Sequence, residues 1–164
     1  LWHEKKYEEI HFNFTNGMRV DYSKWAQGYR IKVNGNNTSW YKATGEDYSY
    51  QTFRKYMNQI FMYAGTASLS KELKSISLSD LQVGDVFIIG GHPGQAMIVV
   101  DMAEDYMGNK AILVAQSYMP AQDIHVVTNL KDKAKSPWYI INRTTKEFNF
   151  PEYHFNSSQI MRFQ

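Results

Sequence analysis

Near the start of the chain, apolar residues recur with a period of two. Residues 10–20 alternate apolar and polar side chains around Asn16-Gly17, a pair that favours a tight turn, so we expect a β-hairpin. Residues 1–7 contain Glu and Lys residues that favour helix, and they predict the end of one. Residues 21–45 are rich in Gly, Asn and Tyr, which predicts irregular structure with a turn at Asn34-Gly35.

The middle of the chain has the three- and four-residue spacing of amphipathic helices. This spacing over residues 53–64 predicts a helix whose aromatic face is core and whose end is capped by Gly65. A shorter helix is expected over residues 69–76, with Leu69, Leu73 and Ile76 on its apolar side.

Beyond residue 85, short apolar runs separated by turn residues indicate β-strands. They are expected over residues 86–89, 96–102, 111–115, 124–127 and 138–141. The connections are too short for crossover helices, so the strands should be antiparallel. Helices followed by a strand meander predict an α+β fold, and the lack of a linker predicts a single domain over residues 1–164.

Composition excludes several classes of protein. The 164 residues include no Cys, which rules out disulfides, thiolate metal sites and thiol catalysis by these residues. A net charge of +2 gives no electrostatic footprint for nucleic acid. No apolar run approaches the roughly 20 residues that span a bilayer. No His or carboxylate spacing predicts a metal site, no phosphate or dinucleotide motif is present, and we expect no cofactor.

The turn Leu81-Gln82-Val83-Gly84-Asp85 is followed by two further segments of the predicted sheet, residues 94–101 and 111–117. This layout resembles the NlpC-type and CHAP cell-wall cysteine amidases, which have a papain-like fold. It implies an antiparallel sheet or half-barrel with helices packed on one side. It also implies a catalytic His at the start of the second strand, an orienting polar residue on the third strand, and a nucleophilic Cys on an upstream helix.

Four longer blocks of sequence carry a second resemblance: residues 7–14, 25–30, 63–69 and 115–125. They are similar to an uncharacterised domain family found mainly in Bacteroidetes. Members of that family usually have an upstream Cys-Ala-Asp segment and a His where this chain has Gln95, and they generally carry export signals. The resemblance therefore implies a secreted, periplasmic or cell-surface bacterial protein, and it establishes no activity.

Two departures from these families bear on catalysis. The chain contains no Cys, and Gln95 can form hydrogen bonds but cannot act as a general base near neutral pH. Two explanations are open for the missing Cys. The start at Leu1 rather than Met suggests that the Cys belongs to an upstream segment, whereas Gln95 favours a loss of the activity. His92 is either a substitute base or an exposed loop residue.

Four side chains are candidates for the catalytic positions: Gln95, Gln116, Ser117 and His92. Alternation over residues 112–116 places Gln116 on the apolar face, where a long amide needs a partner. Gln116 would therefore orient residue 95, or it would cap the end of its strand. A Ser-His-Asp set of Ser117, His92 and Asp101 can also be drawn, on spacing alone.

Four further side chains are candidates for substrate binding: Trp25, Arg30, Tyr118 and Gln122. A Trp face beside a guanidinium could stack a sugar or hold a carboxylate, but the sequence favours the alternative in which Trp25 covers the hairpin and the tip of Arg30 is solvated. Tyr118 and Gln122 would line the loop at the same end of the sheet as Gln116, or would be an ordinary packed aromatic and a surface amide.

Three functions remain open from the sequence. The first is a monomeric, catalytically incomplete domain that binds a peptidoglycan-derived peptide or glycan. The second is an active cysteine amidase or peptidase in a longer protein, and the third is a protein-interaction module. The first requires Gln95 and Gln116 to lie on the same face of the sheet, within hydrogen-bond reach.

Overall fold

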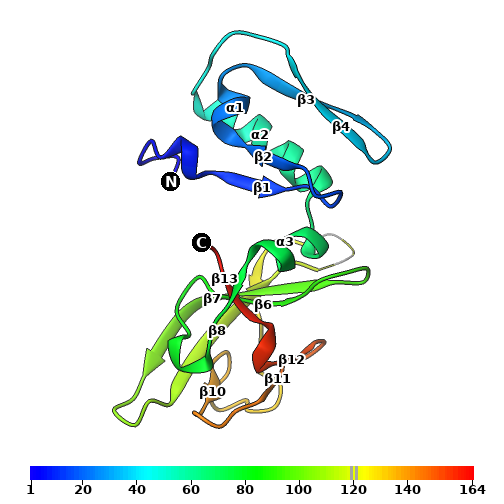
Figure 1. Cartoon of the computed structure of the whole chain (residues 1–164). Helices are drawn as coiled ribbons and strands as arrows, with labels where there is room; N and C mark the ends of the chain where they lie inside the picture. The colour runs from blue at the N-terminus through cyan, green and yellow to red at the C-terminus, as the bar shows by residue number, and fades with distance from the viewer. Residues whose placement is uncertain (119, 121) are drawn as a thin grey trace. The chain divides into compact units, whose positions relative to one another are not determined.

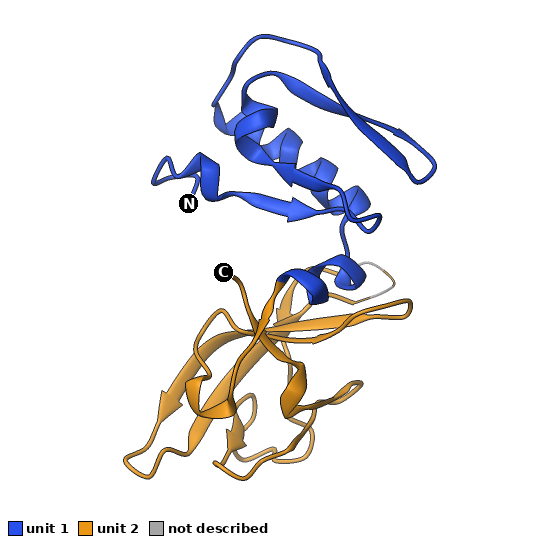
Figure 2. Cartoon of the chain, viewed as in Figure 1, with its two compact units in different colours: residues 1–72 blue, residues 73–164 orange. Residues whose placement is uncertain are grey.

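The chain forms two compact units in a computed structural model that describes residues 1–118, 120 and 122–164 (Figure 2). Unit 1 is Leu1–Glu72 and unit 2 is Leu73–Gln164, and each has its own hydrophobic core. Met119 and Ala121, which belong to the family block at 115–125, lie outside the described residues. Helices and antiparallel strands are both present, which confirms the α+β class. The single domain stays a prediction.

Unit 1 combines helices with two separate β-hairpins (Figure 1). Its elements are η1 (Tyr7–Glu9), β1 (His11–Asn13), β2 (Arg19–Asp21), α1 (Tyr22–Ala26), β3 (Tyr29–Asn34), β4 (Asn37–Lys42), α2 (Tyr50–Tyr63) and α3 (Thr66–Glu72). The predicted hairpin is confirmed, because β1 and β2 pair with Phe12 opposite Val20. The predicted long helix is α2, whose first turn is capped by the Ser49 hydroxyl, which accepts a hydrogen bond from the backbone N–H of Thr52 at 3.3 Å.

The core of unit 1 is aromatic. Tyr22 and Tyr56 are fully buried, and their rings meet edge to face at 5.2 Å. The Tyr56 hydroxyl donates a hydrogen bond to the Val20 carbonyl at 2.7 Å, which satisfies a polar atom that burial would otherwise leave without a partner. Burial raises the pKa of Tyr56 above its ordinary value, so this hydroxyl keeps its proton.

Several expectations for unit 1 were wrong. Residues 1–6 form turns rather than helix: Lys5 has a left-handed backbone (φ 58°), and Trp2 packs on Phe53 and hydrogen-bonds to Tyr22. This tertiary packing outweighs the helix propensity of the segment. Residues 21–45 are not irregular, because they form α1 and the β3–β4 hairpin. The turn at Asn34-Gly35 is confirmed.

The ends and faces of the two predicted helices also differ in detail. The helix α2 ends at Tyr63 with Ala64 as its extended C-cap, and Gly65 takes no left-handed conformation. Phe61 is 73 % exposed, so the aromatic side of α2 is core only in part. The next helix, α3, stops at Glu72, before Leu73.

Unit 2 is built on an antiparallel sheet with the strand order β10-β8-β7-β6-β13-β5, and β9 also pairs with β8 (Figure 1). Its elements are β5 (Lys74–Ser75), η2 (Leu78–Asp80), β6 (Val86–Ile89), β7 (Gln95–Glu104), β8 (Lys110–Gln116), β9 (His125–Val126), β10 (Tyr139–Ile141), β11 (Glu147–Asn149), β12 (His154–Asn156), η3 (Ser157–Gln159) and β13 (Ile160–Arg162). All the predicted strands are present. The described part of unit 2 contains no α-helix.

The turn that enters β6 is fixed by a buried carboxylate. Gly84 has φ +95°, a conformation that favours glycine, and it places Asp85 at the start of the strand. The Asp85 side chain is 1 % exposed and accepts hydrogen bonds from Arg162 Nε at 2.7 Å and Arg162 Nη2 at 2.9 Å. It also accepts one from the backbone N–H of Gln82 at 2.7 Å. The Leu-x-x-Gly-Asp motif therefore joins this turn to β13.

Candidate functional site

Two amide side chains meet at one end of the sheet in unit 2. Gln95 is the first residue of β7 and Gln116 is the last residue of β8. The Gln95 Nε2 donates a hydrogen bond to Gln116 Oε1 at 3.2 Å. The two positions that the sequence paired as catalytic residue and orienting residue are thus in direct contact.

The strand period explains this contact. In β8, Ile112 and Val114 are fully buried on the core face, and Gln116 continues the same alternation at 7 % exposure. The register of Ile98 opposite Ala115 makes Gln95 a diagonal neighbour of Gln116 on that face. A buried amide without a partner is destabilising, so the hydrogen bond from Gln95 keeps Gln116 in place.

Gln116 also lines a pocket of about 250 Å³. The pocket wall combines polar and apolar side chains from β8, β9 and nearby loops, among them Gln116, Tyr118, Gln122, His125, Leu130 and Glu152. Three of the predicted site residues, namely Gln116, Tyr118 and Gln122, therefore surround one cavity. The rings of Tyr118 and Tyr153 lie 6.2 Å apart, and burial raises the pKa of Tyr153, so its hydroxyl stays protonated.

His125 is a pocket residue that the sequence did not single out for this site. It lies directly opposite Gln116 in the β8–β9 pair, so both side chains are on the same face. Its Nδ1 lies 3.0 Å from the Asp123 carbonyl, and donation of the Nδ1 proton there leaves Nε2 free to accept a hydrogen bond. The strand predicted over residues 124–127 could have indicated His125 as a site residue. Once this strand pairs with β8, one of its side chains must lie opposite Gln116, and that side chain is His125.

The other two candidates for catalytic positions lie outside the pocket wall. His92 is exposed in the loop between β6 and β7, and Ser117 is exposed directly after β8. The carboxylate of Asp101 accepts a hydrogen bond from the backbone N–H of Met102 at 2.8 Å. No hydrogen bond joins Ser117, His92 and Asp101, all three of which the structure describes, so the Ser-His-Asp set drawn from spacing gains no support.

Trp25 and Arg30 both belong to unit 1, where they contact each other. The Arg30 guanidinium lies 4.2 Å from the centroid of the Trp25 ring and donates a hydrogen bond to the Trp25 carbonyl at 2.8 Å. Trp25 is only 5 % exposed. Its burial argues against stacking of a sugar on this ring, and the predicted role of the pair in ligand binding stays a prediction.

A family model described as DUF4846, a domain of unknown function (4846), matches residues 1–162. The chain belongs to the DUF4846 family. The expectation of an uncharacterised domain family that covers nearly the whole chain is therefore confirmed, and membership of DUF4846 assigns no activity to the pocket. No match was found among curated proteins or among solved structures.

The described residues contain no group of three or more His, Cys, Asp or Glu side chains placed to hold a metal ion. In the same part of the chain, no helix has both the length and the apolar character needed to cross a membrane.

Proposed function

We propose that unit 2 of this DUF4846 chain binds a cell-wall peptide or glycan in the pocket beside Gln95 and Gln116, without hydrolysing it. The observation that carries the proposal is the 3.2 Å hydrogen bond between the amides of Gln95 and Gln116. The resemblance to papain-like amidases assigns these two positions to the catalytic base and its orienting residue. The 164 residues contain no Cys that could complete such a site, and a pocket lies beside the amide pair.

The pocket suits a neutral, hydrogen-bonding ligand. Gln116 and Gln122 each present an amide, which can donate and accept hydrogen bonds, and Tyr118 presents a hydroxyl. Backbone amides of a peptide and hydroxyls of a sugar match these groups. A volume of about 250 Å³ lies just below the range of drug-sized ligand pockets, so the pocket takes one part of a longer molecule.

The chemistry of the 164 residues supports binding without cleavage. They contain no Cys, so they supply no thiolate nucleophile. Gln95 has no group that titrates near neutral pH, and its amide is held by Gln116.

The source of the ligand follows from the proposed fold. We propose a papain-like half-barrel of the NlpC and CHAP type, in a secreted, periplasmic or cell-surface bacterial protein. Peptidoglycan would be the natural ligand there. Support comes from the antiparallel β6-β7-β8 meander, the Gly84-Asp85 turn before it and the amide pair at its end.

Calorimetric titration with a soluble disaccharide-tetrapeptide muropeptide tests this proposal. The 164-residue chain should bind the muropeptide, and Gln116→Leu should weaken binding roughly tenfold, because one well-formed hydrogen bond in a desolvated site accounts for about one such factor. Gln122→Ala should weaken it less, since Gln122 is exposed. Gln82→Ala is the matched control: Gln82 is also an exposed amide of unit 2, away from the pocket wall.

Three results would contradict the proposal. Equal affinity of the wild-type chain and Gln116→Leu for the muropeptide would show that the pocket at Gln116 is not the binding site. Mass-spectrometric detection of a cleaved muropeptide would show a hydrolase and contradict binding without cleavage. Failure to bind the muropeptide, with binding of a protein partner instead, would favour an interaction module.

A further inference from the structure

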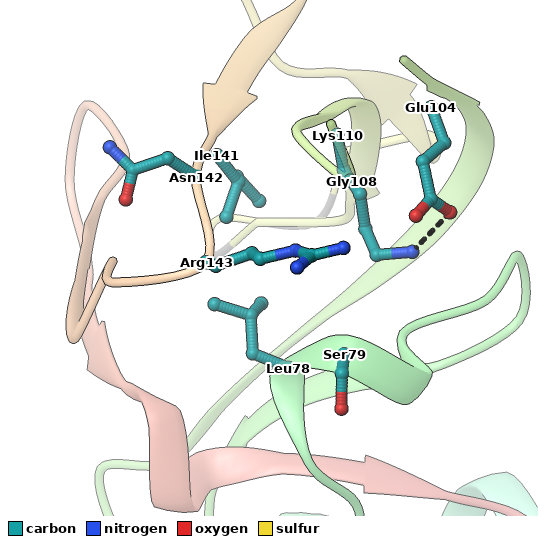
Figure 3. A pocket seen from close by; sticks show the side chains of 8 residues that line it. All are labelled: Leu78, Ser79, Glu104, Gly108, Lys110, Ile141, Asn142 and Arg143. Atoms are coloured by element: carbon teal, nitrogen blue, oxygen red, sulfur yellow. Dashed lines mark hydrogen bonds and ion pairs between the residues drawn. The ribbon is translucent and has the colours of Figure 1, made fainter. Parts of the chain in front are cut away.

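A second pocket lies at the opposite end of β8, which runs from Lys110 to Gln116. It has a volume of about 390 Å³ and lies between η2, the adjoining ends of β7 and β8 with their connecting turn, and the turn after β10 (Figure 3). The side chains that matter here are Leu78, Glu104, Lys110, Ile141 and Arg143, together with Gly108. Because it shares no wall residue with the Gln116 pocket, it can be tested separately.

One of the two cations in this pocket is already neutralised. Lys110 Nζ lies 2.7 Å from Glu104 Oε2, and the two residues are directly opposite each other in the β7–β8 pair. The Lys110 side chain is only 7 % exposed, whereas the Glu104 side chain is 45 % exposed. A buried ammonium is costly unless it is paired, so this ion pair is a fixed part of the wall.

The second cation, Arg143, has no such partner. No carboxylate lies within 4.0 Å of its guanidinium, and no hydrogen bond to its side chain is formed, in the part of the chain that the structure describes. Figure 3 shows the Arg143 side chain extending between Leu78 and Ile141, with its guanidinium directed toward Gly108 and Lys110. The pocket therefore carries one positive charge that nothing in its wall compensates.

Gly108 creates the space that the guanidinium occupies. Its φ is +79°, and a Cβ built on it would lie 2.5 Å from Arg143 Nε. Any side chain at residue 108 would displace Arg143 as well as straining the backbone. The turn between β7 and β8 thus fits this position of Arg143.

We propose that this pocket binds a small carboxylic acid that carries an apolar group. The carboxylate would accept two parallel hydrogen bonds from the fork of the Arg143 guanidinium. The apolar group would lie against Leu78 and Ile141. A single uncompensated positive charge matches a monoanion, and the nearby Glu104 carboxylate disfavours a phosphate dianion.

The test compares two probes that differ only in charge. N-acetyl-L-leucine carries the carboxylate, and N-acetyl-L-leucinamide is its neutral counterpart. Titration of the ¹⁵N-labelled 164-residue chain should shift the amide resonances of Gly108, Lys110 and Arg143 with the acid, with roughly tenfold weaker binding of the amide because the charge-assisted bonds are lost. Equal binding of both probes, or no shift at these amides with the acid, would overturn the proposal.

Substitutions of Arg143 distinguish bidentate hydrogen bonding by its guanidinium from a general effect of positive charge on binding of the acid. Arg143→Gln should reduce affinity for the acid to that for the amide, and Arg143→Lys should restore it only in part, since an ammonium lacks the bidentate geometry. The control Lys133→Gln removes an exposed cation of unit 2 outside this wall and should leave affinity unchanged. Unchanged binding by Arg143→Gln would contradict the proposal. Muropeptide binding at Gln116 should be unaffected by all three variants.

Discussion

The two units use their polar groups in different ways. In unit 1, the Tyr56 hydroxyl is bound to the Val20 carbonyl, and Arg30 covers Trp25 and binds its carbonyl. In unit 2, Gln116 and Arg143 are each part of a pocket wall, and Gln116 is held there by a second amide. The polar groups named in unit 1 contact other groups of the same unit, whereas those in unit 2 face space that a ligand could fill.

Aromatic content alone therefore does not locate the pockets of this chain. Aromatic residues make up 15 % of the sequence, and the large rings Tyr22, Trp25 and Tyr56 are buried in the core of unit 1. The pockets discussed here occur where the strands of unit 2 end, as at Gln116 and Lys110. A polar side chain that continues a buried strand face is the more informative signal.

The largest expected effect is a loss of stability in unit 2 that leaves unit 1 unchanged. Asp85→Ala should destabilise unit 2 by about 3 kcal/mol, because it removes a buried carboxylate, leaves the Gln82 N–H without its acceptor and leaves Arg162 with only the Asp80 carbonyl. Hydrogen exchange should accelerate at Val99 and Val114 and stay unchanged at Tyr56. The exposed Asp101→Ala should cost less than about 0.5 kcal/mol. Equal acceleration in both units would contradict the comparison.

A smaller effect is expected in unit 1. Tyr56→Phe should destabilise that unit by about 1.5 kcal/mol, since the Val20 carbonyl loses its donor in a buried site. Urea unfolding followed by hydrogen exchange in α2 measures this change. Tyr41→Phe, at a residue that is 51 % exposed, should be neutral. A neutral Tyr56→Phe would mean that this hydroxyl does not serve packing.

The amide of Gln116 should matter less for stability than for binding. Gln116→Leu should change the free energy of unfolding of unit 2 by less than about 1 kcal/mol, because Leu suits the buried face and the half-buried Gln95 can turn to water. Urea midpoints of the wild-type chain and the variant give the value. A loss comparable to that of Asp85→Ala would make the amide pair a structural element and weaken the contrast between the units.

The smallest effect concerns alkaline pH in unit 2. Burial raises the pKa of Tyr139 to about 12, from an ordinary value of 10.0, and its hydroxyl donates to the Thr128 carbonyl at 2.9 Å. The stability that this group contributes is therefore complete below pH 10 and is lost as the pH rises toward 12. The stability difference between the wild-type chain and Tyr139→Phe should shrink over that interval. A difference that stays constant from pH 8 to 11.5 would contradict the assignment.

The sequence predicted the contact between Gln95 and Gln116 but not all of the structure around these two residues. Gln95 and Gln116 could be brought together because strand alternation and antiparallel pairing are local rules. In residues 29–34, Tyr29, Ile31 and Val33 also alternate with polar residues, and this pattern indicates the β3–β4 hairpin that the Gly, Asn and Tyr content of residues 21–45 conceals.

Features that depend on distant contacts could not be predicted in this way. The partner of Asp85 is Arg162, on a three-residue strand whose run of apolar residues is too short to stand out. The pocket at Arg143 is formed by turns that are far apart in the sequence, and its unpaired guanidinium becomes visible only when its neighbours are known. Local patterns specify strands, and tertiary structure decides which ends of those strands meet.

The central claim is that the pocket at Gln116 binds a cell-wall fragment without cleaving it, and one NMR titration tests both parts. The ¹⁵N-labelled 164-residue chain is titrated with the disaccharide-tetrapeptide muropeptide, and the proton spectrum of the ligand is followed in the same sample. We predict shifts at the amides of Gln116, Gln122 and His125, with the ligand spectrum intact after prolonged incubation. Absence of those shifts, or new resonances from a cleaved amide bond, would contradict the claim.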